Sequence, residues 1–120
     1  ENLAFLGAMS TTKLFFFPTG SSNTQSITQY PSSAHGPEGE SVSLHCRFTI
    51  HYSYYVMSWF RQLPNGKMTE IIYLYSDSTS TMKGRYSVSF QKGYKTLTLT
   101  ITSLMPTDSG IYFCAVGETP

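Results

Sequence analysis

The chain is poor in charge. Asp, Glu, Lys and Arg together make up 12% of its 120 residues, and the formal net charge is only +1. The eight basic residues are scattered, which argues against a nucleic-acid surface or a polybasic membrane-binding segment. No apolar run approaches the roughly 20 residues that a membrane-spanning helix needs. If the natural protein is membrane-bound, we expect its anchor to lie outside these residues.

Patterns that carry catalysis or hold metals are missing as well. The three histidines, His35, His45 and His51, stand in separate segments, and there is no glycine-rich phosphate loop. Serine is too common for a Ser-His-Asp arrangement to be argued from linear order. No Asn-x-Ser/Thr acceptor for N-glycosylation occurs. We therefore expect no catalytic residue, no metal site and no cofactor.

Strand-like alternation dominates what is present. A chain of 13.4 kDa is one domain with room for a single core, and its many Ser, Thr and Tyr residues favour strands over helices. The runs 41–48, 86–90 and 95–101 alternate polar and apolar residues with a period of two. This predicts an all-β protein. In the last two runs the residues expected to point inward are Val88, Phe90, Leu97, Leu99 and Ile101.

Two cysteines and the only tryptophan are spaced in a familiar way. Trp59 follows Cys46 by a dozen or so residues, and a distant Cys114 stands two places after Tyr112. With these residues the chain resembles an immunoglobulin variable domain of the T-cell receptor alpha/delta type, from about Gln25 to Val116. The segments that carry the resemblance are Trp59-Phe60-Arg61-Gln62, Lys83 to Val88, Phe90-Gln91-Lys92 and Asp108 to Val116.

This resemblance implies a V-type β-sandwich of two antiparallel sheets with an internal disulfide. Cys46 and Cys114 would be bonded to each other, with Trp59 and Tyr112 packed beside them in the core. Two cysteines in a small all-β chain then indicate an oxidising, extracellular compartment. The alternative is a pair of free buried thiols in a cytosolic protein. The placement of Trp59 and Tyr112 favours the disulfide.

An ion pair at the bottom of the sandwich is also implied by the resemblance. Its partners would be Arg85 and Asp108. A solvated pair of this kind would stabilise the fold little, and a sequestered one more.

The resemblance further implies two recognition surfaces. Ligands would be bound by three hypervariable loops, which are rich in tyrosine and serine, and tyrosine offers much contact area with few torsions to freeze. The candidate ligand-binding residues in these loops are His51, Tyr52, Tyr54, Tyr55, Tyr75, Asp77, Gly117 and Glu118. Some of the tyrosines are expected to pack on the framework instead. A second variable domain would pair with an outward face of the central sheet formed by Phe60, Gln62, Met68 and Phe113.

The first 24 residues do not belong to this domain pattern. Residues 1–10 resemble a protease-cleavage tail with cloning residues added for expression, with natural sequence as the alternative. Residues 11–18 resemble the last strand of a variable domain, although they stand before the domain. Residues 19–24 would be a linker, and 25–120 the V-type domain itself.

The segment Thr11 to Phe17 offers a strand to a domain that lacks one. The chain stops soon after Cys114, so the edge of Ile111 to Val116 would be unpaired. We expect Thr11 to Phe17 to pair with that edge, either within the chain or by strand exchange with a second molecule. The short linker slightly favours exchange.

On these grounds we interpret the chain as an antigen-receptor variable domain. It would be the ectodomain of a plasma-membrane receptor, with a second variable domain, of the same or a different chain, and a protein or peptide-presenting ligand as partners. A non-rearranging V-type domain of a cell-surface receptor or adhesion protein is the alternative. A protein studied for its assembly is a third class, raised by the N-terminus.

Overall fold

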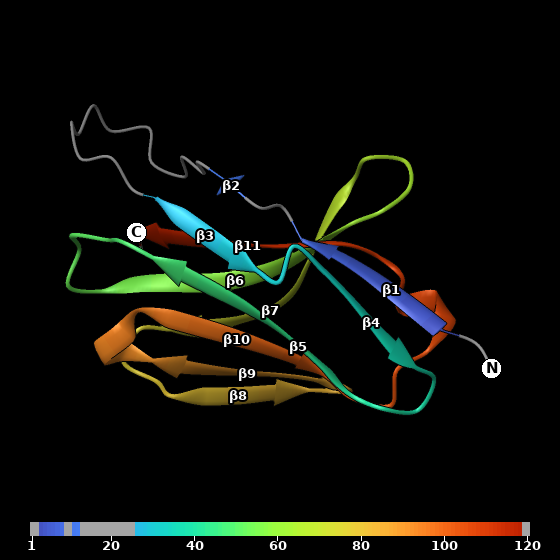
Figure 1. Ribbon diagram of the computed structural model, residues 1–120. Helices are drawn as coiled ribbons and strands as arrows, with labels where there is room; N and C mark the ends of the chain where they lie inside the picture. The colour runs from blue at the N-terminus through green and yellow to red at the C-terminus, as the bar shows by residue number, and fades with distance from the viewer. Residues whose placement is uncertain (1–2, 9–10, 13–25, 119–120) are drawn as a thin grey trace.

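Residues 3–8, 11–12 and 26–118 are described by a computed structural model. They form a sandwich of one five-stranded and one six-stranded sheet (Figure 1), which confirms the predicted all-β class. The elements, in chain order, are β1 (Leu3–Ala8), β2 (Thr11–Thr12), β3 (Ile27–Tyr30), β4 (Ser33–Pro37), β5 (Val42–Phe48), β6 (Tyr55–Gln62), β7 (Met68–Tyr75), β8 (Ser80–Lys83), β9 (Tyr86–Gln91), the 3-10 turn η1 (Lys92–Tyr94), β10 (Thr96–Ile101), the 3-10 turn η2 (Pro106–Asp108) and β11 (Gly110–Glu118).

The order and direction of the strands define the two sheets. The five-stranded sheet runs β4-β1-β11-β6-β7, and the six-stranded sheet runs β2-β3-β5-β10-β9-β8. Every neighbouring pair among these strands is antiparallel except β1 with β11. The predicted sandwich of two antiparallel sheets is therefore confirmed, with one parallel pairing added at the N-terminal strand.

The core fills the space between the sheets as the alternation predicts. β10 pairs with β5 on one side and β9 on the other, so its inward residues meet their counterparts on both neighbours. Each of the five side chains expected to point inward from β9 and β10 is buried. At one end of this core Phe48 and Phe90 stack 5.9 Å apart, and both rings meet Tyr55 edge-on. Sequence periodicity thus placed the inward side chains of β9 and β10 correctly.

The connection between β6 and β7 is a tight turn built on Asn65 and Gly66. Gly66 has φ of +87°, a conformation that favours glycine, and its N–H donates to the Leu63 carbonyl at 2.8 Å. The Asn65 side chain accepts a hydrogen bond from the backbone N–H of Lys67 at 2.9 Å. This turn returns the chain in register, so that Met68 lies opposite Gln62.

One segment expected as a turn-rich connection is a strand. Residues 33–40 contain Gly and Pro, yet Ser33–Pro37 forms β4 at the edge of the five-stranded sheet. An edge position tolerates Pro37 because a missing N–H there interrupts no central ladder. Gly36 is required for close packing, since a Cβ at this position would lie 2.8 Å from Leu104 Cδ2.

The N-terminal segments also depart from expectation. Leu3–Ala8, which was set aside as a tail, forms β1 between β4 and β11 (Figure 1). Thr11–Thr12 forms β2 and pairs with β3 in the other sheet, so the expected pairing of these two residues with the Cys114 strand is wrong. Residues 13–17 and the expected linker 19–24 lie outside the described residues. The physical reason is that the backbone edge of β11 needs a partner strand, and β1 pairs with it from Gly110 to Tyr112.

Candidate recognition loops and pairing face

The first and second candidate loops, which follow β5 and β7, are hydrogen-bonded to each other at one end of the sandwich. The β5–β6 connection and the C-terminal end of β11 both lie at the left of the molecule in Figure 1. Where β6 begins and β7 ends, the Ser76 N–H donates to the Tyr55 carbonyl at 2.9 Å. The buried Ser76 hydroxyl accepts the Tyr55 N–H at 3.1 Å in return. These bonds hold the first loop directly beside the second.

Exposed tyrosines gather at this junction. The rings of Tyr54 and Tyr75 are stacked 5.9 Å apart and nearly parallel, and Tyr73 meets Tyr75 edge-on at 5.7 Å. The pKa of the Tyr54 hydroxyl is raised by partial desolvation, and then by the nearby Asp77 carboxylate and by Tyr75. Asp77 and His51 are both exposed, as a ligand-binding role requires.

Tyr55 was expected on the recognition surface, and this is wrong. Its side chain is 1% exposed and packs edge-on against the stacked rings of Phe48 and Phe90 in the core. Tyr52 is half-buried and lies against the same core, so it offers only part of its surface to a ligand. In the first loop, Tyr54 is therefore available to a ligand, whereas Tyr55 is part of the core.

Gly117 and Glu118 belong to the end of β11. They pair with Val56 and Tyr55 on β6, so this part of the expected third loop is a strand. Glu118 is exposed and Gly117 is half-buried. Residues 119–120 lie outside the described part of the chain.

The expected pairing residues share the outer face of the five-stranded sheet. Phe60 and Phe113 are register partners on β6 and β11, and their rings stack 5.5 Å apart. Gln62 lies one step along β6, beside Met68 on β7 and Ile111 on β11. Met68 is half exposed, and Ile111 adds an exposed apolar side chain that our sequence prediction omitted. The period of two that placed Phe113 on this face also places Ile111 there.

Phe113 differs from its neighbours in exposure. Its side chain is only 2% exposed, so little of it is available to a partner in this state of the chain. Phe60 and Gln62 are half-buried. The accessible part of the face is the row formed by Met68, Gln62 and Ile111. That Phe60, Gln62, Met68 and Phe113 pair with another variable domain stays a prediction.

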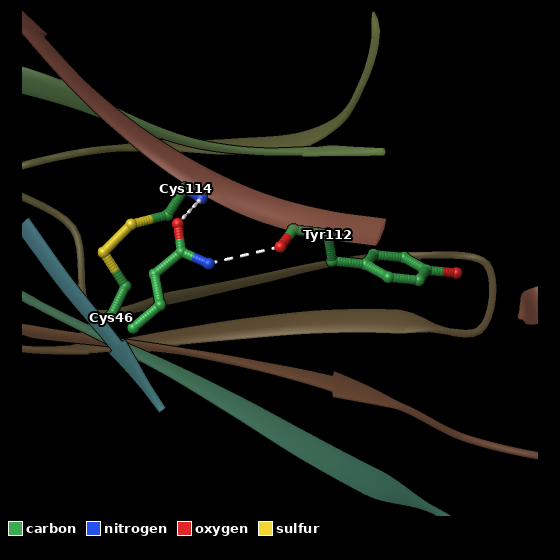
Figure 2. The surroundings of a disulfide bond; sticks show 4 residues. Cys46, Tyr112 and Cys114 are labelled. Carbon is green, nitrogen blue, oxygen red and sulfur yellow. Dashed lines mark hydrogen bonds between the residues drawn. A yellow bond between two sulfur atoms is a disulfide. The ribbon is translucent and has the colours of Figure 1, made fainter. Parts of the chain in front are cut away.

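The disulfide lies at the centre of the sandwich. Cys46 on β5 and Cys114 on β11 are bonded, with their Cα atoms 6.4 Å apart, and both are fully buried (Figure 2). Trp59 is paired opposite Cys114 in the sheet and is also fully buried. The expected disulfide and its packing against Trp59 are therefore present.

A buried amide that sequence analysis missed joins the sheets beside this disulfide. Gln29 of β3 donates through its Nε2 to the Tyr112 carbonyl at 3.2 Å and accepts the Cys114 N–H at 3.0 Å (Figure 2). Its side chain is almost fully buried. Alternation alone does carry a signal, because it places Gln29 on the same face of β3 as the buried Ile27. A buried glutamine implies a fixed hydrogen-bonding partner.

The expected ion pair closes the other end of the sandwich. Two nitrogens of Arg85 donate to the two carboxylate oxygens of Asp108, each at 2.7 Å, and Asp108 is buried. The backbone N–H of Met105 also donates to Asp108 at 2.8 Å. Burial raises the pKa of this carboxyl, but the hydrogen bonds and the charge of Arg85 outweigh it, so the pKa is lowered. The same contacts raise the pKa of Arg85.

Tyr112 is tied into the same end. Its hydroxyl donates to the Asp108 carbonyl at 2.7 Å, and the guanidinium of Arg61 lies 5.8 Å from its ring centre. Burial raises the pKa of Tyr112 well above its ordinary value. Arg61 donates to the carbonyls of Thr107 and Ser109, which explains Gly110, because a Cβ there would lie 3.2 Å from Arg61 Nε. These contacts tie the η2 turn to β6 and β11.

Two other kinds of site are absent from the described ranges. No cluster of three or more His, Cys, Asp or Glu side chains is placed to hold a metal ion among residues 3–8, 11–12 and 26–118. No helix in that part of the chain is long and apolar enough to cross a membrane.

Comparison with known proteins points to one family. Residues 29–120 match the immunoglobulin V-set domain family. Human T cell receptor alpha variable 14/delta variable 4 is 37% identical over 95 residues, covering 78% of this chain and 82% of that protein. Human T cell receptor alpha variable 38-2/delta variable 8 is 33% identical over 96 residues, with the same coverage. The human T cell receptor alpha chain MC.7.G5 is 33% identical over 96 residues, which are 34% of its length.

Proposed function

The chain belongs to the immunoglobulin V-set family as a variable domain homologous to those of T-cell receptor alpha and delta chains, which act in antigen recognition, and we propose that it recognises a protein or peptide-presenting ligand while paired with a second variable domain. The domain would be the extracellular part of a plasma-membrane receptor. We assign it no catalytic role and no cofactor.

One observation carries this proposal: two candidate surfaces lie on different parts of one sandwich. Tyr54 and Asp77 sit at the loop end, whereas Met68 and Ile111 sit further along the outer face of the five-stranded sheet. β6 and β7 run through both regions. One partner can therefore contact the outer face of the sheet while another contacts the loop end. A domain that pairs and binds ligand at the same time needs this separation.

The pairing surface has the composition of an interface core. Phe60, Met68 and Ile111 surround the neutral Gln62, and interface cores are depleted in charge and enriched in aromatic residues and Met. Gln62 provides a hydrogen-bonding side chain at the centre of the row. Ser58, on the same strand, donates to Glu70 at 2.8 Å and so holds this carboxylate at the border of the face.

A non-rearranging V-type receptor or adhesion domain remains the second candidate. The loop and sheet geometry is common to both. The two differ in what the full-length transcript encodes downstream of these 120 residues: a joining segment supports the antigen receptor, and a continuous exon into a stalk or membrane span supports the alternative.

The pairing proposal is tested by sedimentation velocity. The chain is measured alone and mixed with a panel of variable domains of the same family, first as wild type and then as Met68→Glu. We expect association with at least one domain, weakened at least tenfold by the variant, because an uncompensated charge would be buried at the interface.

Met82→Glu is the matched control, since Met82 is 76% exposed on β8, away from this face. It should leave association unchanged. Absence of association with every domain, or equal weakening by the two variants, would refute pairing through this face.

A further inference from the structure

Three tyrosines form a continuous exposed cluster between the loops and the pairing face. Tyr54, Tyr73 and Tyr75 are 43%, 51% and 41% exposed. Tyr54 stacks on Tyr75, and Tyr73 meets Tyr75 edge-on. We call these three rings the tyrosine cluster. It presents aromatic faces and edges to solvent over two neighbouring elements.

The backbone fixes the cluster in place. Tyr73 and Tyr75 project from the same side of β7, opposite Ser58 and Val56 of β6. Beyond the strand, the Ser78 N–H donates to the Tyr75 carbonyl at 2.9 Å and closes the turn. Tyr54 precedes Tyr55, whose backbone is bonded to Ser76 in both directions. A partner would therefore meet rings that are already ordered, which lowers the entropy cost of binding.

Acidic side chains flank the cluster on both sides. Asp77 lies close enough to Tyr54 to raise the pKa of its hydroxyl. Glu70 is held by the Ser58 hydroxyl and borders a groove of about 440 Å³ that Tyr73 and Tyr75 also line. Lys83 lies on the β8 wall of this groove. Neither carboxylate forms a salt bridge with any residue in the described part of the chain.

We propose that the tyrosine cluster is a receiving site for a cationic side chain, above all an arginine, presented by the protein ligand. A guanidinium stacks on aromatic faces, and its donors reach carboxylates in a planar fork. Tyr75 would supply the stacking surface, with Asp77 and Glu70 supplying the charge. This inference rests on the proposed function, because it takes the loop end as the ligand side.

The test uses an arginine peptide as the probe. Acetyl-Gly-Arg-Gly-amide is titrated into the isotope-labelled chain while the tyrosine ring resonances are followed by NMR. Acetyl-Gly-citrulline-Gly-amide serves as the matched peptide without charge. We expect saturable shifts at Tyr54, Tyr73 and Tyr75 with the arginine peptide only. Binding should weaken about two- to fivefold in Tyr75→Leu, and also in Asp77→Asn.

Tyr94→Leu is the matched protein control. Tyr94 is 67% exposed in η1, next to Lys92 and Lys95 rather than beside carboxylates. Its substitution should leave the titration unchanged. Equal responses to the two peptides, no shift of the cluster, or equal effects of Tyr75→Leu and Tyr94→Leu would overturn the proposal. The titration requires no pairing, so its failure is distinguishable from failure of the sedimentation test.

Discussion

Gln29 is a single side chain that holds the two sheets together. Replacing it with Ala would leave the Cys114 N–H and the Tyr112 carbonyl buried without partners. A buried polar group without a hydrogen-bond partner is destabilising, because it has given up its bonds to water. We therefore expect Gln29→Ala to lower the free energy of unfolding by about 2 to 4 kcal/mol. Urea denaturation measures this. The exposed Gln91 is the control, and its Ala variant should change stability by no more than about 0.5 kcal/mol.

Asp108 makes stability depend on pH in a defined direction. Its folded-state pKa lies below the unfolded value of about 3.9, so its contribution is present above that value and is lost as pH falls through the lowered folded pKa. We expect Asp108→Asn to cost about 2 to 3 kcal/mol near neutral pH, toward the low end for buried pairs because Arg85 is partly solvated. Thermal unfolding from pH 7 down to strongly acidic pH follows the difference between wild type and variant. A difference that stays constant below about pH 4 would contradict this account.

The disulfide stabilises the fold by restricting the unfolded chain. Cys46 and Cys114 are 68 residues apart, and a loop of that size gives about 4 kcal/mol on the chain-entropy estimate. We expect the double variant Cys46→Ala, Cys114→Ala to unfold at much lower denaturant concentration. Mass spectrometry of the non-reduced wild type checks the premise, and two free thiols would refute it.

Sequence reasoning succeeded at residues whose partners the period of two determines. It placed Val88, Phe90 and Leu99 inward by alternation, whereas Trp59 and Tyr112 were placed in the core by the family resemblance. It failed at Tyr55, because adjacent Tyr54 and Tyr55 are chemically identical and only the starting point of β6 decides which one is buried. The low exposure of Phe113 could not be predicted from the sequence either, because it depends on tertiary packing.

At the scale of elements, β1 is the strand whose removal is most informative. It pairs with β4 at five positions and with β11 at three. Deleting residues 1–10 would expose backbone edges on both neighbours, so we expect a lower melting temperature and a greater tendency to aggregate. Differential scanning calorimetry and light scattering measure these effects. If both stay at the wild-type values, residues 1–10 act only as a tail.

A point variant separates strand pairing from the loss of a segment. Leu6 is paired with both Ala34 and Gly110, and Leu6→Pro removes a backbone donor from β1 without shortening the chain. We expect it to reproduce most of the deletion's effect on melting temperature. β1 was not predicted as a strand because residues 1–10 resemble a cleavage tail, and β4 was not predicted because Gly36 and Pro37 indicate a turn. Their pairing comes from the open edge of β11, a feature of the assembled sheet.

At the scale of the molecule, the account requires pairing and recognition to occupy separate surfaces. Met68 marks the pairing face, Tyr54 marks the recognition end, and Met82 lies on β8, in the other sheet, on the wall of the groove that Tyr73 and Tyr75 also line. All three side chains are exposed in the single chain. Met and Tyr are readily oxidised, so one experiment reports on the three surfaces at once.

Hydroxyl-radical footprinting with mass spectrometry, on the chain alone and in its associated state, tests this claim most directly. Association should protect Met68 strongly while Tyr54 and Met82 keep their rates of oxidation. Protection of Met82 or Tyr54 with Met68 unchanged would contradict the account, since the paired domain would then cover a surface other than the pairing face.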